Sequence, residues 1–417
     1  MKTTLKAMFL AGTVLAIPGV VLADTVVCEP GNDGPATGAP IRVGGIFGNA
    51  APGDFSSATR AASAYFACVN ASGGIHGRPV EYGVENDQWN PELAAQAAAK
   101  LVEDQGVVAL VGNASFVEMS VNASYYARNG VMVMASGCAV SECFESSNIV
   151  STNQGPLASS VGAAMYAVED LGATNIACIG LAIPSVGNWS CGAVESYMEA
   201  QGLRASSVLM NPGAPDVNSS LLEAIASGAD SILVNLPAGL GIAFLGAAEQ
   251  QALRDVYTWT SSTPLYDVSV PGALGSYWDG ALYVNAELTP LDGEGEHARH
   301  WRAVMDDYGR TDDPRDTFSQ AGYLSARFFT QLLSTMDPAE IDDRAAVTAA
   351  IQGIVGYESD LICGPYYVGV ADRHMPNRAG TMVRVSDGGF EVVRECYEYE
   401  GPYFEPLIEA ERALGLH

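Results

Sequence analysis

The chain has 417 residues, of which 48% are hydrophobic and only 16% charged. This length and apolar content predict two or three domain-sized units with sizeable cores and exclude an intrinsically disordered chain. The 48 acidic and 20 basic residues give a formal charge of −28, and such a field argues against nucleic acid and anionic membrane surfaces as partners.

The first 23 residues have the features of an export signal. Lys2 and Lys6 precede an apolar run at residues 7–22, which Pro18 interrupts and which ends in small residues up to Ala23. This order predicts a signal peptide at residues 1–23. A membrane anchor is the alternative, but a run this short, broken by proline, is poorly suited to spanning a bilayer. We expect an exported protein without a later transmembrane segment.

The remaining sequence alternates between strand and helix patterns. Residues 24–40, rich in Gly, Pro and Asp, predict an extended N-terminal arm. A first series then predicts strands at 41–47, 80–84, 107–111 and 131–135, and helices at 58–69, 91–103 and 118–128. A second series predicts helices at 156–171, 190–200, 218–227 and 240–253, and strands at 176–179, 206–209, 231–235 and 257–260. Two such series predict an α/β fold with two doubly wound lobes.

The last quarter of the chain must rejoin these lobes. Its patterns predict helices at 318–335 and 345–354 and a pair of strands at 382–385 and 390–396. A final helix is expected at 404–414, within a C-terminal segment of residues 401–417.

All eight cysteines follow the predicted cleavage site, and an even number in an exported chain favours disulfides. Sequence alone does not fix the pairing. Zinc is the alternative, but the cysteines lack the tight pairs of a zinc site and the five histidines are scattered. We therefore expect no metal and no free thiol. Proximity along the chain favours the pairs Cys138–Cys143, Cys178–Cys191 and Cys363–Cys396, which leaves Cys28 for Cys68.

No familiar catalytic or nucleotide-binding motif is present. The sequence has no GK[ST] phosphate loop, no GxSxG nucleophile and no HExxH zinc motif. Gly44, Gly45 and Gly48 do not have the spacing of a dinucleotide-binding turn. We expect no catalytic residue and no cofactor, and the absence of these motifs favours a binding function over an enzymatic one.

Four segments of the first series together resemble a known family. They are Ile41-Arg-Val-Gly-Gly-Ile-Phe47, the turn Asn70-Ala-Ser-Gly-Gly-Ile-His-Gly77, Glu85-Asn-Asp-Gln-Trp-Asn-Pro91, and Val108-Ala-Leu-Val-Gly112. With the signal peptide, this series is similar to the periplasmic solute-binding proteins of branched-chain amino-acid-type ABC importers. The resemblance covers residues 41–369, most of the chain after the signal peptide.

The resemblance implies the type I binding-protein fold, in which three hinge crossovers join two Rossmann-like lobes. The crossovers are expected near 151–153, 285–288 and 361–365. Lobe 1 would then contain residues 41–152 and 287–362, and lobe 2 residues 153–286 and 363–400. The ligand would lie in a cleft between the lobes, at loops that follow the carboxyl ends of the strands.

The resemblance also suggests ligand-contacting residues, each with a simpler alternative. Phe55 falls near an aromatic that covers the ligand in the family, and Trp189 falls where the family has an aromatic at a helix start. Both could instead be ordinary packing residues. Asn113 and Ser115 could contact ligand or cap the next helix. Further candidates are Ser136, and Asn235 and Ala238 in a lobe 2 turn.

The positions that hold an amino acid in the family differ here. The family's serine falls at Phe116, beside Ser115, its backbone carbonyl at Gly137 and its threonine at Ala139. The acid that pairs with the ligand ammonium falls at Ser262, which has no charge. A buried ammonium without a counter-charge is costly, so we expect a neutral or aromatic solute. The alternative is an alignment shift of one residue, with an amino acid as ligand.

The leading hypothesis is a periplasmic receptor that captures a small organic solute and delivers it to the permease subunits of an ABC importer. We expect it to act as a monomer. A periplasmic sensor subunit that reports ligand to a membrane kinase or chemoreceptor is the alternative with the same fold. A secreted enzyme is a third possibility, which the missing motifs disfavour.

Overall fold

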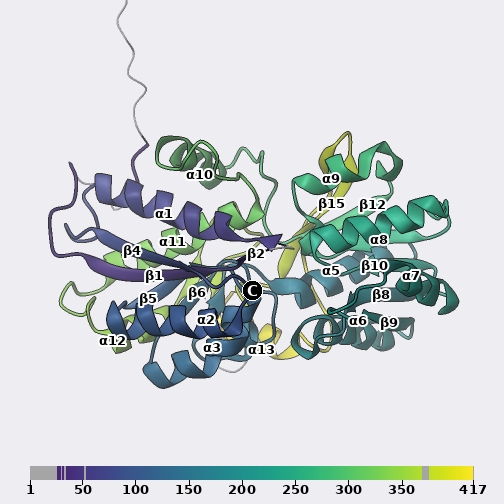
Figure 1. Cartoon of the computed structure of the whole chain (residues 1–417), viewed down its shortest axis with the longest axis horizontal. Coiled ribbons are helices and arrows are strands. Elements are labelled where there is room, and N and C mark those ends of the chain that lie inside the picture. Colours follow the sequence, from purple (N-terminus) through teal and green to yellow (C-terminus); the bar gives the residue numbers. More distant parts are fainter. Residues whose placement is uncertain (1–25, 30, 32–33, 51–52, 369–374, 417) are drawn as a thin grey trace, which may run out of the picture.

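The computed structural model describes residues 26–29, 31, 34–50, 53–368 and 375–416. The predicted signal peptide lies outside these residues. Two α/β lobes stand side by side, and the chain passes between them near the middle of the molecule (Figure 1). The α/β fold with two lobes is therefore confirmed.

Lobe 1 is built on a parallel sheet with the strand order β4-β1-β5-β6-β7. The middle strands are buried along nearly their whole length, which explains their continuous apolar runs. The bounds are β1 Ile41–Phe47, β4 Val80–Asn86, β5 Ala109–Asn113, β6 Val133–Ala135 and β7 Ile149–Ser151.

The helices of lobe 1 come from two distant parts of the chain. The first part contributes α1 Ser56–Ala71, α2 Pro91–Ala99 with the π-helical turn Lys100–Asp104, α3 Phe116–Asn129 and α4 Glu142–Glu145, and the short pair β2 Asn49–Ala50 and β3 Gly53–Asp54. The second part contributes α10 Glu296–Asp307, α11 Thr317–Thr335, α12 Arg344–Gln352, β13 Val355–Tyr357 and β14 Tyr366–Tyr367. Helix α11 packs along α1 (Figure 1).

Lobe 2 is built on a sheet with the order β16-β15-β12-β11-β10-β8-β9. Five strands are parallel, and β15 and β16 add an antiparallel pair at one edge. The strands are β8 Asn175–Leu181, β9 Arg204–Met210, β10 Ser231–Val234, β11 Thr258–Ser261, β12 Leu282–Ala286, β15 Ala379–Ser386 and β16 Gly389–Glu398. The helices are α5 Gly155–Glu169, α6 Trp189–Ala200, α7 Val217–Ala226, α8 Ala238–Gln250 and α9 Ser269–Leu274, and a further helix, α13 Glu405–Leu414, follows β16 in the chain.

Several elements were not predicted from the sequence, among them strand β12 in the middle of the lobe 2 sheet, helix α10 and strand β7. Helix α10 was not predicted, because it buries only the narrow stripe Ala298, Trp301, Val304 and Met305 on an otherwise polar helix. Strand β7 was not predicted, because a strand of three residues is too short to show a pattern in the sequence. It is the edge strand of the sheet and pairs only with β6 among the described strands.

The chain leaves lobe 1 between β7 and α5 and returns between β12 and α10. Tyr366 and Val368 still pack in the lobe 1 core, and the next described strand, β15, is in the lobe 2 sheet. We therefore propose a third passage after Val368, so that lobe 1 comprises 41–152 and 287–368 and lobe 2 comprises 153–286 and 375–400.

All eight cysteines are paired in disulfides as predicted, and none is free. Cys28–Cys68 ties the N-terminal arm to α1, and Cys178–Cys191 ties β8 to α6. Cys138–Cys143 closes a short loop after β6. Cys363 precedes β14 of lobe 1 whereas Cys396 lies on β16 of lobe 2, so their bond links the two lobes.

Candidate functional site

Four aromatic side chains lie side by side at the carboxyl edge of the lobe 1 sheet. We call Phe55, Trp89, Phe116 and Phe318 the aromatic row. Phe55 meets Phe318 edge-on at 4.5 Å and Trp89 edge-on at 5.2 Å between ring centroids, and Trp89 stacks on Phe116 at 4.5 Å. All four are half-buried. Partly exposed rings gathered at the ends of parallel strands are typical of a ligand surface.

The indole of Trp89 is fixed by the loop that follows β1. Its Nε1 donates to the carbonyl of Ala50 at 2.9 Å and to that of Gly53 at 3.1 Å. The ring occupies the space over Gly48, where an added Cβ would lie 2.3 Å from a ring carbon. The glycine is therefore required for the close approach of the indole.

A buried polar cluster lies behind the aromatic row. The Ser115 hydroxyl donates to the Asp87 carboxylate, and its oxygen accepts the Glu118 N–H at 3.2 Å. Ser115 is thus the N-cap of α3, the alternative considered from sequence. Burial raises the pKa of Glu118 to about 8, although hydrogen bonds from Tyr126 and Asn113 act to lower this pKa. Burial also raises the pKa of Asp87.

The loop after β6 contributes to the site through its backbone. The Ser136 hydroxyl lies 3.1 Å from the Ala321 carbonyl and 2.7 Å from Ser325 Oγ, so it bonds to α11 inside lobe 1. A Cβ at Gly137 would come within 3.2 Å of the Phe318 ring, which places this glycine against the aromatic row. Ala139 is half-buried within the loop closed by Cys138–Cys143.

Lobe 2 presents a chain of neutral hydrogen bonds at its own carboxyl edge. The Ser262 hydroxyl donates to Asn235 Oδ1 at 2.7 Å, and Asn235 Nδ2 donates to Ser190 Oγ at 2.5 Å. These three residues are buried. Ala238 begins α8 nearby in sequence and is half-buried. The arrangement supplies dipoles without a formal charge.

Trp189 does not join the aromatic row. It stacks on Phe144 of lobe 1 with 5.7 Å between centroids, and it meets Tyr403 edge-on at 6.3 Å. Its indole nitrogen is buried and has no hydrogen-bond partner among the described residues. A buried donor of this kind is usually completed by water or ligand.

The lobes also touch away from the crossovers. The Ser141 N–H donates to the Ser185 carbonyl at 3.0 Å, close in sequence to the Phe144–Trp189 stack. The Thr317 hydroxyl donates to the Tyr266 carbonyl at 3.2 Å, next in sequence to Phe318 of the aromatic row. The candidate site therefore lies where the lobes meet.

Sequence reasoning missed two members of the row. Trp89 lies inside the Glu85–Pro91 segment that carried the family resemblance, but nothing in the pattern indicated where its ring would point. Phe318 comes from α11, far along the chain from Phe55, and only the pairing of α1 with α11 brings the two together.

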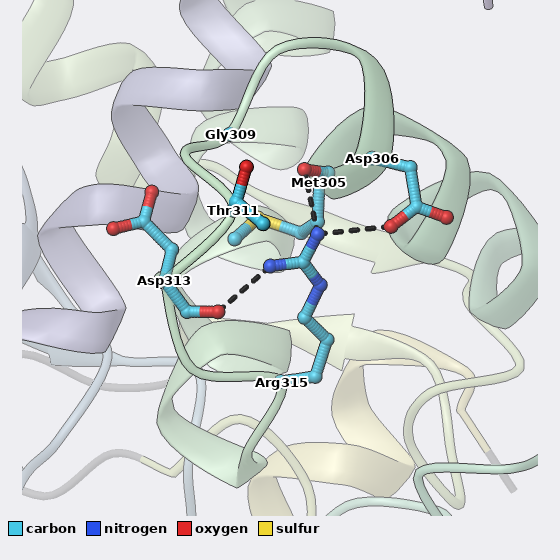
Figure 2. Close-up of a pocket in the computed structure, with 6 residues that line it drawn as sticks. All are labelled: Met305, Asp306, Gly309, Thr311, Asp313 and Arg315. Carbon is cyan, nitrogen blue, oxygen red and sulfur yellow. Dashed lines mark hydrogen bonds and ion pairs between the residues drawn. The ribbon is translucent and has the colours of Figure 1, made fainter.

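Cavities also lie elsewhere among the described residues. One of about 230 Å³ adjoins the Cys363–Cys396 bond and is lined in part by Arg378 and Glu411. Another, of about 360 Å³, lies at the end of α10 (Figure 2). It is lined by Met305, Asp306, Gly309, Thr311, Asp313 and Arg315.

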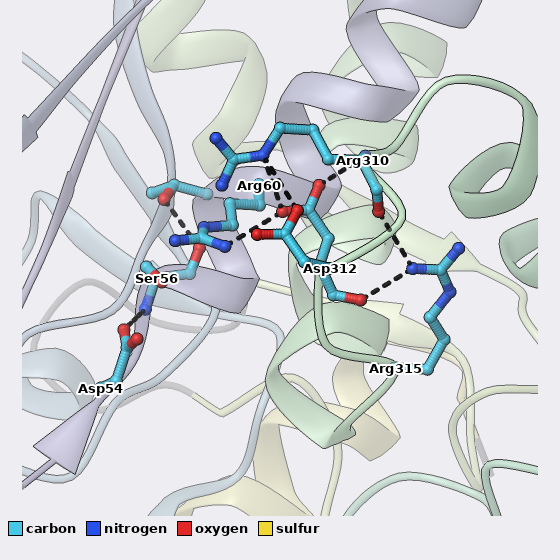
Figure 3. A network of polar contacts seen from close by, with 8 residues as sticks. Asp54, Ser56, Arg60, Arg310, Asp312 and Arg315 are labelled. Atoms are coloured by element: carbon cyan, nitrogen blue, oxygen red, sulfur yellow. Dashed lines mark hydrogen bonds and ion pairs between the residues drawn. The ribbon is translucent and has the colours of Figure 1, made fainter.

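Arg315 has a structural role in the second of these cavities. Its guanidinium donates to the carbonyl of Met305 at 2.8 Å and to the Asp306 carboxylate at 2.9 Å, which satisfies the carboxyl end of α10. The network continues to α1, because Arg60 and Arg310 both pair with Asp313, at 3.1 and 3.3 Å. Figure 3 shows Arg60, Arg310 and Arg315 close together in this network.

Neither a membrane-spanning helix nor a metal cluster is found in the described part of the chain. No helix there combines the length and apolar character that a bilayer requires. Within the same residues, no three histidine, cysteine, aspartate or glutamate side chains are placed to share a metal ion.

Comparisons with known proteins point to one family. Residues 40–389 match the family described as periplasmic binding protein. A substrate-binding protein of an ABC transporter from Sphaerobacter thermophilus superposes with a TM-score of 0.74 at 18% identity, over 88% of this chain and 100% of that one. A possible leucine/isoleucine/valine-binding protein from Rhodopirellula baltica gives 0.73 at 13% identity, over 87% and 98%.

A third solved structure carries a bound compound. It is a solute-binding protein of an ABC transporter from Rhodopseudomonas palustris in complex with p-hydroxybenzoic acid, with a TM-score of 0.72 and 20% identity over 88% of this chain and 98% of that one. A search of curated proteins found no match.

Proposed function

Because the chain belongs to the periplasmic binding protein family, as a type I member of the branched-chain amino-acid type, we propose that it captures one small organic solute between its lobes for an ABC importer. Membership of a class of ABC transporter substrate-binding proteins confirms the resemblance seen in the sequence. What we propose beyond this membership is the chemical class of the ligand and the delivery of that ligand to an ABC importer.

The observation that carries the ligand proposal is the aromatic row. Four partly exposed rings at the carboxyl edge of lobe 1 offer an apolar, planar surface. Phe55 and Phe116 of this row are residues that the sequence also proposed. The ligand would lie on these rings and complete its hydrogen bonds with the lobe 2 dipoles of Asn235 and Ser262.

The ligand is accordingly a neutral or aromatic solute rather than an α-amino acid. Ser262 stands where an amino-acid receptor would place an acid, and its hydroxyl is engaged by Asn235. A zwitterion would leave its ammonium buried without a counter-charge. The protein from Rhodopseudomonas palustris with p-hydroxybenzoic acid is an example of an aromatic ligand in this fold.

The same family suggests the location and partners. The protein would act in the periplasm as a monomer and dock its closed form on the permease subunits. Closure of two lobes around a hinge gives the importer two distinguishable states, empty and loaded.

The test is a thermal-shift screen of the purified mature protein. Benzoate, 4-hydroxybenzoate, other small aromatic and neutral solutes, and leucine, isoleucine and valine are compared. A ligand at 100 times its dissociation constant adds about 2.7 kcal/mol of stability, which is readily detected. Stabilisation by an aromatic solute supports the proposal, and stabilisation by the branched-chain amino acids alone contradicts it. Loss of uptake after gene deletion would support the transport role.

A further inference from the structure

The turn between β4 and α2 has an unusual backbone. Gln88 and Trp89 are consecutive residues with φ of 52° and 56°, in the left-handed region. Residues other than glycine avoid this region, and two in succession are costly. Such conformations persist only where surrounding contacts enforce them, and they concentrate at ligand-binding positions.

Three hydrogen bonds enforce the turn. The Asp87 carboxylate accepts the Trp89 N–H at 2.9 Å, and the Asn86 side chain accepts the Gln88 N–H at 2.9 Å. The Asn90 N–H then donates to the Asp87 carbonyl at 2.9 Å. Asp87 is fully buried and also receives the Ser115 hydroxyl. One carboxylate thus fixes both the Trp89 backbone and the N-cap of the helix that begins with Phe116.

The start of α2 does not by itself require this strain. Asn90 has an extended conformation and caps α2 by accepting the Glu92 and Leu93 N–H groups, and Pro91 occupies the first turn. What the left-handed turn achieves is the placement of the indole over Gly48 and between Phe55 and Phe116. The indole remains partly exposed although its nitrogen is hydrogen-bonded and Gly48 and Phe116 lie against its faces, so the surface left for a ligand is along its edge.

We propose that Trp89 is the specificity-determining residue of the ligand site, and that Asp87 is the positioning residue that holds it there. This inference rests on the proposed solute-binding function. The ligand carries a planar ring that packs against the indole, in place of the branched aliphatic chain of an amino acid. Asp87 does not touch the ligand and acts by fixing the backbone of Trp89.

The test combines calorimetric affinity with intrinsic fluorescence, using 4-hydroxybenzoate and a set of substituted benzoates as probes. The chain has five tryptophans, and Trp259, Trp278 and Trp301 are fully buried in the cores. Ligand-induced quenching should therefore come from Trp89 or Trp189, and the Trp189→Phe variant separates the two. We expect Trp89→Leu to weaken binding of the aromatic probe about tenfold, the loss of one edge-to-face aromatic contact. Trp89→Phe, which keeps a ring, should weaken it less and abolish the quenching.

The matched control is Trp189→Phe, which should keep the quenching signal. Asp87→Asn tests the positioning role, because it keeps the size of the side chain but weakens its hydrogen bonds. It should weaken binding and raise the mobility of Trp89, seen as lower fluorescence anisotropy in the Trp189→Phe background. A merely structural aspartate would lower stability and leave the anisotropy unchanged.

The outcomes separate this inference from the proposed function. If the wild type binds an aromatic probe and Trp89→Leu, shown to be folded by circular dichroism, binds it as tightly, the role of Trp89 is overturned while the receptor function stands. If the wild type binds only aliphatic solutes, the aromatic specificity is overturned but a receptor function remains. If no solute of any class binds, both fail.

Discussion

The Glu287 carboxylate, one residue after β12, accepts the backbone N–H of Gln154, one residue before α5, at 3.1 Å. Two of the passages between the lobes therefore meet at a single side chain. Burial raises the pKa of Glu287 to about 7, while hydrogen bonds from Asn153, from the Gly155 N–H and from Thr263 act in the opposite direction. The carboxylate also lies at the N-terminus of α5, where a negative charge is favourable.

Glu287 should make the stability of this junction depend on pH. Because burial raises the pKa of its carboxyl from 4.5 to about 7, the ionised form is the less favourable one in the folded protein. Glu287→Gln keeps the size of the side chain and stays neutral, so at pH 8 we expect it to have a higher free energy of unfolding than the wild type, by about 1.4 kcal/mol for each pKa unit. Denaturant unfolding measures the difference. The control Glu294→Gln changes an exposed residue and should have no effect.

Glu118 should make stability depend on pH. Burial raises the pKa of this carboxyl from its ordinary value of 4.5 to about 8 in the folded protein. Between these values the folded chain keeps a proton that the unfolded chain has lost, so stability falls as pH rises and levels off above about pH 8. Glu118→Gln should flatten this decline and be the more stable protein at pH 8, with each pKa unit worth about 1.4 kcal/mol.

Thermal unfolding of both proteins at pH 5, 6.5 and 8 checks the Glu118 prediction. The raised pKa of Glu287 has the same sign, so some slope should remain in Glu118→Gln. An unchanged slope in the variant would show that Glu118 is ionised within the folded protein at neutral pH.

Removing a single disulfide should cost more stability the longer the loop that it closes, with a logarithmic dependence on loop length. Cys363–Cys396 spans 33 residues and Cys138–Cys143 only five. The chain-entropy relation predicts losses of about 4 and about 2 kcal/mol for the two double serine variants. Denaturant unfolding compares them, and thiol titration of the unfolded wild type without reductant should detect no free thiol. Equal losses would contradict the entropic account.

Gly48 should tolerate no side chain. A methyl group there would lie 2.3 Å from the Trp89 ring, so Gly48→Ala must displace the indole. We expect a loss of about 1–3 kcal/mol from overpacking, together with weaker binding of the aromatic probe. Gly246→Ala on α8 is the matched control, because nothing lies within 4 Å of its added Cβ. That change should leave binding intact and slightly raise the melting temperature.

Local patterns predicted the fold better than they predicted the site. The expected strand at 41–47 coincides with β1, since a strand buried on both faces is apolar along most of its length. The site depends on contacts that no local pattern contains. Ser115 and Ser136 were predicted from type and position, but whether their hydroxyls face ligand, a helix N-terminus or α11 is decided by neighbours from elsewhere in the chain. The pairing of Phe55 with Phe318 likewise depends on how α11 packs on α1.

The packing of α11 on α1 constrains the order in which the chain can fold. Gly322 of α11 lies directly against the backbone of Ala58 in α1, with no room for a side chain between them. During synthesis of the chain, the core of lobe 1 therefore cannot be completed until the ribosome has passed residue 322. By then β8–β12 of lobe 2 already exist, but its edge strands β15 and β16 do not. Neither lobe is a continuous stretch of chain, so both reach their final form late and through distant contacts, which is typical of slow-folding topologies.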